Sequence, residues 1–136
     1  MAPSILSPAS PVLPNTAALI SLAPTLLGIN AILHPRTALN LLQFRTPQDA
    51  EAQRLVDNLM RIYGARNVAF GLPTLIAWYF GHREILGWLS ISGVVVAGVD
   101  GCITRLQNGQ GEWNHWPFAL VGVGLGGGLL GWFGGW

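Results

Sequence analysis

Tyr63, Arg66, Asn67, Asp100 and His115 are the side chains of this sequence whose types and spacing suit acid–base chemistry. Arg66 and Asn67 lie three and four residues after Tyr63, so the three share one face of a helix. Aspartate, histidine and tyrosine can donate or accept a proton, and arginine can stabilise negative charge. We therefore predict a catalytic group that consists of Asp100, Arg66, His115 and Tyr63.

Four residues near this group are expected to bind the substrate: Asn67, Arg61, Asn30 and Trp116. Asn30 lies near the end of the first apolar segment of the chain, and Trp116 directly precedes the last one. Arg61 lies about one turn before Arg66, where its long side chain could instead reach lipid headgroups or pair with Asp57.

Several other kinds of chemistry are excluded by composition. The chain has no lysine, which rules out Schiff-base catalysis and a phosphate-binding lysine loop. Cys102 is the only cysteine, and the three histidines are far apart in sequence, so we expect no disulfide, no metal site and no cofactor. Gly122, Gly124 and Gly127 match a dinucleotide-binding pattern, but no strand precedes them. A formal net charge of +1 argues against a nucleic-acid partner.

The elements that must position these side chains are apolar. Hydrophobic residues make up 51% of the chain and charged residues 10%, which is too little charge to cover a soluble domain. A helix needs roughly 20 residues to cross a bilayer. Four apolar segments have about this length: 16–33, 62–81, 85–104 and 117–136. We predict an all-α fold, an integral membrane antiparallel four-helix bundle that forms one domain over residues 1–136, with residues 1–14 as a flexible leader.

Capping signals predict where the helices begin. Asn15 is expected to cap the first helix. Thr46, Pro47 and Asp49 predict that the second helix starts at Pro47. Its polar first third should project into water before it continues to Gly81.

The two charges inside the second and third segments are expected to pair. Arg66 and Asp100 are equally far in sequence from Arg83, the centre of the predicted turn, so they should lie at the same depth in an antiparallel hairpin. A lone charge near the centre of a span costs about 2.5 to 3.5 kcal/mol, and a charge-assisted hydrogen bond offsets much of that cost. The pair could belong to a functional site or could simply lock the two helices together.

The arginines also predict an orientation. The first and third loops carry Arg36, Arg45, Arg54 and Arg105, whereas the second carries Arg83 alone. The positive-inside rule then places loops 1 and 3 in the cytosol and both termini on the far side. We expect the protein in the endoplasmic reticulum membrane.

Three motifs carry a resemblance to a known family: "RIYGARNVAFG" at 61–71, "VDG" at 99–101 and "NHW" at 114–116. With them the chain resembles small four-helix integral membrane proteins of fungi that are grouped as a domain of unknown function, with a distant similarity to DoxX-like bundles. The family pattern, carried over, points to Tyr63, Gly64, Arg66, Asn67, Gly71, Asp100 and His115. Its fungal members often occur among genes for polyketide and terpenoid biosynthesis, which implies an apolar substrate.

These observations lead to two hypotheses about function. The first is a membrane-embedded cyclase or isomerase that acts by acid–base catalysis on a lipophilic polyketide- or terpenoid-type intermediate. Burial favours a neutral carboxyl and a nearby arginine favours a charged one, so Asp100 could be a proton donor or an anion. The second is a non-catalytic membrane accessory or scaffold that docks or stabilises a biosynthetic partner. The glycine spacing of 117–136 suits a homo-oligomer, and it suits close packing within the bundle equally well.

Overall fold

The computed structural model describes residue 7 and residues 10–133, and this part of the chain holds α-helices, one short 3-10 helix and no strand. The elements in chain order are α1 (Val12–Leu33), α2 (Pro35–Leu41), α3 (Ala50–Tyr79), α4 (Arg83–Asn108), η1 (Glu112–Asn114) and α5 (Trp116–Leu129). The expectation of an all-helical protein is confirmed. The chain adds one short helix, α2, between the first two long ones.

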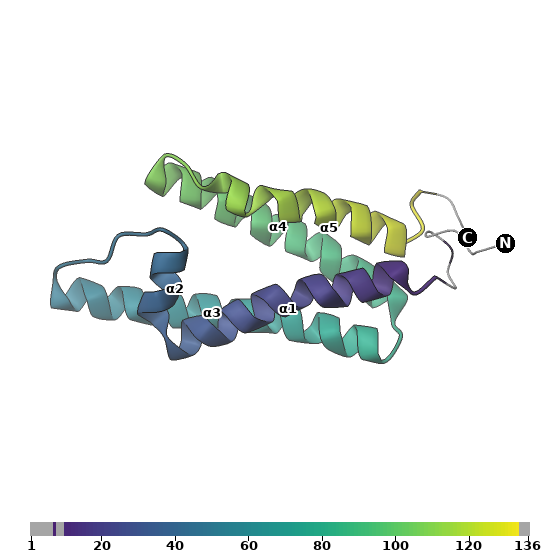
Figure 1. Cartoon of the computed structure of the whole chain (residues 1–136), viewed down its shortest axis with the longest axis horizontal. Coiled ribbons are helices and arrows are strands. Elements are labelled where there is room, and N and C mark those ends of the chain that lie inside the picture. Colours follow the sequence, from purple (N-terminus) through teal and green to yellow (C-terminus); the bar gives the residue numbers. More distant parts are fainter. Residues whose placement is uncertain (1–6, 8–9, 134–136) are drawn as a thin grey trace.

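The four long helices form two antiparallel pairs, α1 with α3 and α4 with α5 (Figure 1). Within the first pair, the backbones touch because two glycines face each other. A Cβ on Gly28 would lie 2.6 Å from the carbonyl oxygen of Gly64. Further along, a Cβ on Gly71 would lie 2.8 Å from the carbonyl oxygen of Ser21. Gly64 and Gly71, which the family pattern singled out, therefore serve the packing of α1 on α3.

The second pair uses glycine in the same way. A Cβ on Gly122 would lie 3.1 Å from the carbonyl oxygen of Ser90, and one on Gly126 would lie 3.1 Å from that of Gly87. The four-residue spacing of Gly122 and Gly126 thus lets α5 lie close against α4 within one chain.

The two pairs meet at one end and separate toward the other (Figure 1). At the closed end, a small core joins Ala17 of α1, Ala77 of α3, Leu86 of α4 and Leu129 of α5. The buried apolar residues nearer the other end belong to α1, α2 and α3 alone: Ala31, Ala38, Leu39 and Met60. Side chains from α4 and α5 do not take part in that second core, so space remains between the pairs.

Two helices are long and apolar enough to cross a membrane, α1 and α4. They also expose large apolar side chains: Leu19 is 68% exposed, Leu26 63% and Val95 66%. The helices α3 and α5 do not meet the same criterion within the described residues. The predicted span 85–104 lies within α4, and 62–81 lies largely within α3.

The first helix begins earlier than we predicted. It starts at Val12, so residues 12–14 are helical and not part of a leader, while residues 1–6 and 8–9 lie outside the described residues. Asn15 is therefore inside α1 and does not cap it. Its Oδ1 instead accepts a hydrogen bond of 2.8 Å from Nε1 of Trp78, which ties α1 to α3.

The second long helix begins later than we predicted. Asp49, not Thr46, is the cap of α3, because its carboxylate accepts a 2.8 Å hydrogen bond from the backbone N–H of Ala52. The helix ends at Tyr79, where Gly81 adopts a left-handed φ of 73° and the His82 N–H bonds to the Ala77 carbonyl.

The last helix is shorter than the predicted span 117–136. It has 14 residues and ends at Leu129, and residues 134–136 lie outside the described residues. The same glycine-based stop operates here: Gly131 has a φ of 74°, and the Trp132 N–H bonds to the Gly127 carbonyl. A helix of this length covers only about 21 Å.

Candidate functional site

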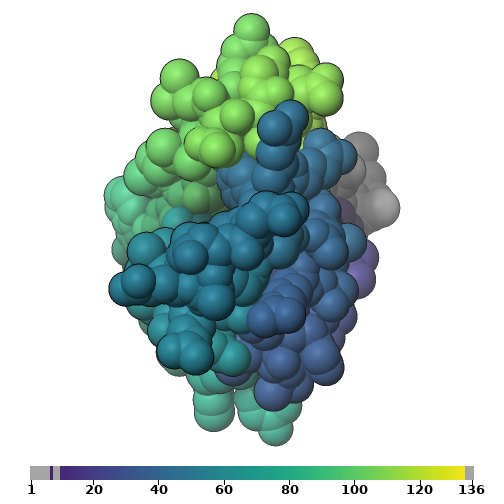
Figure 2. Space-filling view, turned by 90° about the vertical axis from the view of Figure 1, so that its left-hand side faces the viewer, coloured from purple at the N-terminus to yellow at the C-terminus, as the bar shows by residue number. Residues whose placement is uncertain are grey.

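A cavity of about 570 Å³ lies between the two helix pairs. Side chains from all five helices line it, and most of them are apolar. The cavity is partly open. Figure 2 shows the end of the molecule where α2 and the start of α3 lie below the connection from α4 to α5.

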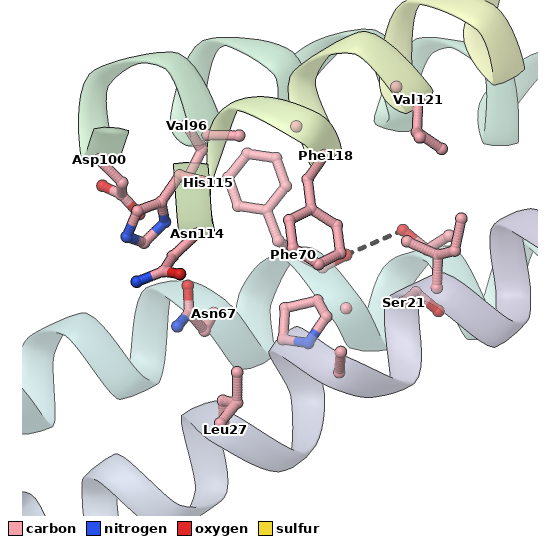
Figure 3. A pocket seen from close by; sticks show the side chains of 18 of the residues that line it. Ser21, Leu27, Asn67, Phe70, Val96, Asp100, Asn114, His115, Phe118 and Val121 are labelled. Carbon is pink, nitrogen blue, oxygen red and sulfur yellow. Dashed lines mark hydrogen bonds between the residues drawn. The ribbon is translucent and has the colours of Figure 1, made fainter. Parts of the chain in front are cut away.

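Polar side chains gather at one end of this cavity (Figure 3). Asn67 of α3, Asp100 of α4, and Asn114 and His115 before α5 lie close together there. Tyr63 also lines the cavity. The elements that carry these residues are far apart in sequence, and only the antiparallel arrangement of the two pairs brings them to one level.

Arg66 and Asp100 form the expected ion pair between α3 and α4. A single guanidinium nitrogen, Nη2 of Arg66, donates to both carboxylate oxygens of Asp100, at 2.8 and 3.1 Å. The Asp100 side chain is 17% exposed and that of Arg66 is 38% exposed. The guanidinium also lies over the ring of Tyr63, with its carbon 4.9 Å from the ring centroid. The prediction that Arg66 and Asp100 face each other is confirmed.

A second set of contacts holds His115. Thr104 is buried, and its hydroxyl donates its one hydrogen to the backbone carbonyl of Asp100 at 2.8 Å. Nε2 of His115 lies 3.3 Å from the same hydroxyl oxygen. Because a hydroxyl has only one hydrogen to donate, we assign the proton in this contact to Nε2 and the acceptor role to Thr104. In the neutral ring, the basic nitrogen is then Nδ1.

Asn67 differs from Asp100 and His115 in its hydrogen bonding. The residue lies in the cavity wall and is 7% exposed overall; its carboxamide forms no hydrogen bond with the described residues, and its polar atoms stay accessible from the cavity. Asn114 likewise carries a carboxamide at the same end of the cavity (Figure 3). The polar end therefore presents hydrogen-bonding groups that the protein itself leaves unused.

The outer rim of this polar end is made by the connections between the helices of each pair. Gln43 follows α2 with an unusual φ of 61°, and it lines the cavity together with Asn114. A Cβ on Gly111 would lie 3.8 Å from the side-chain oxygen of Gln43 and 4.0 Å from the side-chain nitrogen of Asn114. The turn after α2 thus reaches the connection between α4 and α5.

Three predicted substrate-binding residues do not line the cavity. Arg61 is exposed on α3 and donates to Oδ1 of Asn58 at 2.9 Å. Asn30 is half-buried on α1, outside the cavity wall. The indole of Trp116 packs directly on Gly101 of α4, so its place is in the contact between α4 and α5.

Several cavity residues were not predicted as site residues. Phe70 and Thr74 line the wall beside Asn67. They continue its three- and four-residue spacing along α3, so helical periodicity could have found them. Thr104 does not line the cavity but contacts His115, and periodicity could not have found it, because this role depends on a contact between α4 and the residue before α5. Within the described ranges, no three His, Cys, Asp or Glu side chains are placed to hold a metal ion.

Comparison with known proteins gives one match. A search of curated proteins and of solved structures finds no match. A family described as "Domain of unknown function (DUF4267)" matches residues 21–129. The match runs from the middle of α1 to the last residue of α5 and includes the whole cavity wall except Ala17 and Ile20. The resemblance to an uncharacterised family is thereby confirmed, and the chain belongs to the DUF4267 family.

Proposed function

We propose that this protein is a cofactor-independent cyclase or isomerase, embedded in a membrane, that acts by acid–base catalysis on a lipophilic intermediate. The observation that carries the proposal is the cavity itself. Its wall is apolar along most of its length, and a carboxylate, an imidazole, a phenol and three carboxamides meet it at one end. Polyketide- or terpenoid-type intermediates of fungal specialised metabolism combine apolar bodies with carbonyl or hydroxyl groups of the kind that such a cavity suits.

The membrane placement rests on α1 and α4, which are long and apolar enough to cross a bilayer. We propose that α3 and α5 cross with them, since each pairs with one of these helices along its length (Figure 1). The arginines of the first and third loops then favour a cytosolic position for these loops in the endoplasmic reticulum. A reporter fused to either terminus should read out on the far side of the membrane; a cytosolic readout at both ends would invert this topology.

The proposed chemistry assigns one step to each group. Nδ1 of His115 takes a proton from a carbon next to a carbonyl of the substrate. The carboxamide N–H groups of Asn67 and Asn114 hold the oxygen on which the negative charge develops. The resulting carbon nucleophile either takes a proton back at another position, which gives an isomer, or attacks a second carbonyl of the same molecule, which closes a ring. In the ring closure, the new alkoxide takes its proton from the phenol of Tyr63, and the proton held by His115 restores that phenol through solvent. Asp100, paired with Arg66, supplies a fixed negative charge beside the imidazolium.

Hydrogen exchange tests this chemistry without knowledge of the natural substrate. The purified protein in nanodiscs is incubated in D2O with lipophilic ketones and 1,3-diketones, and deuterium uptake at carbon is followed by mass spectrometry. We expect exchange above the rate in empty nanodiscs. His115→Ala and Asp100→Asn should lower the rate about 10²- to 10⁴-fold. His34→Ala is the matched control, because His34 is exposed and lies outside the cavity. Exchange that is absent, or that survives both cavity substitutions, would refute the proposal.

A second candidate is a non-catalytic accessory protein that docks or stabilises a partner enzyme. It is favoured by an exposed apolar stripe on α3, made of Leu55, Leu59 and Ile62, which are 61%, 53% and 66% exposed and recur at helical spacing. Under this hypothesis, product appears only when the partner is co-expressed, and its yield survives Asp100→Asn. Substitution of the leucines by glutamine should then lower the yield.

A further inference from the structure

The carboxamide of Asn67 is the most informative group in the cavity wall. The residue as a whole is 7% exposed, and its carboxamide forms no hydrogen bond with the described residues; its polar atoms are not sealed inside the protein and meet the space at the polar end of the cavity (Figure 3). An amide in such a position can bond only to what fills the cavity, and a ligand that displaces water from it must supply the matching hydrogen bonds or lose affinity. A group of this kind that faces a cavity is satisfied when the cavity is filled by a molecule with the matching atoms.

We propose that the cavity selects lipophilic molecules with an uncharged head that presents a hydrogen-bond donor beside an acceptor. In this proposal, Asn67 is the residue that recognises the head through hydrogen bonds. The inference deepens the proposed function, since it uses the same cavity. A carboxamide offers an acceptor oxygen and a donor nitrogen side by side. Its complement is a donor and an acceptor at the same separation, as in the enol form of a 1,3-diketone.

The charges of the wall argue for an uncharged head. Among the described residues of the cavity wall, Asp100 is the one Asp, Glu, Lys or Arg, and Nη2 of Arg66 contacts both of its carboxylate oxygens. The wall therefore has no unpaired positive charge that could bind a carboxylate head. Its negative charge is already paired with Arg66, so it is not free to pair with an ammonium head. Either ionic head would lose its hydration without a counter-ion.

The rest of the wall argues for an apolar body. From Asn67 the cavity continues past Leu27 of α1, Val96 of α4, and Phe118 and Val121 of α5 (Figure 3). A volume of about 570 Å³ lies in the range of pockets that hold drug-sized ligands. Ligands of the proposed class thus place their head beside Asn67 and their body along the space between the helix pairs.

Binding of a matched set of molecules tests this selectivity. The probes carry the same linear alkyl tail and differ in the head: a 1,3-diketone, a carboxylate, a primary ammonium, or no polar group. Their affinities for the full chain in nanodiscs are measured by competition against a radiolabelled 1,3-diketone, with empty nanodiscs as the blank. We expect the diketone to bind at least about tenfold more tightly than the other three, a difference of about 1.4 kcal/mol.

Substitution of Asn67 tests whether this residue recognises the head group. Asn67→Leu should remove the preference for the diketone and leave the affinity for the plain alkane unchanged. It should not impair folding, because the carboxamide forms no hydrogen bond with the described residues that the substitution would break, and circular dichroism checks this. Asn58→Leu is the matched control, since Asn58 lies on the same helix but is exposed and outside the cavity. Asn67→Gln keeps the carboxamide and should retain part of the preference.

Three results would overturn the inference: equal or tighter binding of a charged head, no binding of the diketone, or a preference that persists in Asn67→Leu. The assay needs no turnover, so its outcome is separate from that of the exchange experiment. An intact preference without deuterium exchange would refute the proposed catalysis alone. Exchange without the preference would refute the assignment of Asn67 alone.

Discussion

The ion pair between Arg66 and Asp100 makes a quantitative prediction about stability. Arg66→Met keeps the aliphatic stem and removes the charge, which leaves the carboxylate of Asp100, 17% exposed, without its partner. Loss of one partner costs about 3 to 5 kcal/mol for a fully buried pair and about 0 to 1 kcal/mol at the surface. Since the carboxylate lies mostly buried but borders the open cavity, we expect a loss of about 2 to 3 kcal/mol.

The converse change should cost less. Asp100→Leu leaves a guanidinium that is 38% exposed and still lies over the ring of Tyr63. We expect about 1 to 2 kcal/mol. The double variant Arg66→Met with Asp100→Leu contains no unpaired charge and should return to within about 1 kcal/mol of the wild type, since apolar replacements of buried pairs are often neutral. The coupling energy should therefore be at least about 2 kcal/mol.

Equilibrium unfolding in mixed micelles, followed by near-ultraviolet circular dichroism, measures these differences. The pair of Arg36 and Asp57 provides the control. Its nitrogen–oxygen distance is 3.4 Å and the arginine side chain is 69% exposed, and the Asp57 carboxylate, although 16% exposed, keeps a hydrogen bond from Nε2 of Gln53 when Arg36 is replaced. Arg36→Met should change stability by no more than about 1 kcal/mol. Single variants at Arg66 and Asp100 that behave like this control, or a double variant as unstable as both singles together, would refute our reasoning about the pair.

Two further predictions concern the tautomer of His115 and the contact between α1 and α3. Thr104→Val removes the acceptor for Nε2–H, so ¹⁵N spectra of His115 should shift toward a mixture of tautomers. Thr104→Ser keeps the acceptor and should keep the wild-type spectrum. Identical spectra for all three proteins would contradict the proposed hydrogen bond. Gly28→Ala places a methyl group 2.6 Å from the carbonyl oxygen of Gly64 and should destabilise the protein by about 1 to 3 kcal/mol in the same unfolding assay. Gly124→Ala is its control, because a Cβ there meets no atom within 4 Å and should add up to about 1 kcal/mol of stability through helix propensity.

The ion pair could be predicted from sequence because a helix has a constant rise per residue. Across a tight turn, residues at equal distance from the turn must lie at similar depth, and this argument places Arg66 opposite Asp100. The rotation of a helix per residue also shows from the sequence that Arg61 does not belong to the same site. It lies two residues before Tyr63, which is about 200° around a helix, so the two side chains point away from each other.

Other parts could not be predicted from the sequence. The rotation of α1 about its axis decides whether Asn30 reaches the cavity, and α1 is too apolar all round for hydropathy to indicate which face packs inward. The end of α5 at Leu129 depends on the left-handed backbone of Gly131, and a segment with many glycines offers several equivalent stopping points. The lack of a partner for Asn67 is visible only when the whole cavity wall is assembled.

The shortness of α5 has a consequence for the surrounding lipid. At about 1.5 Å per residue, the 14 residues of α5 cover about 21 Å and the 26 residues of α4 about 39 Å. In the proposed placement, the acyl chains next to α5 must compress, at a cost of a fraction of a kcal/mol for each ångström of mismatch. This cost is smaller in the endoplasmic reticulum, whose hydrocarbon layer is about 27 Å thick, than in a plasma membrane of about 32 Å. In the proposed placement, the length of this one helix thus favours thin membranes over thick ones.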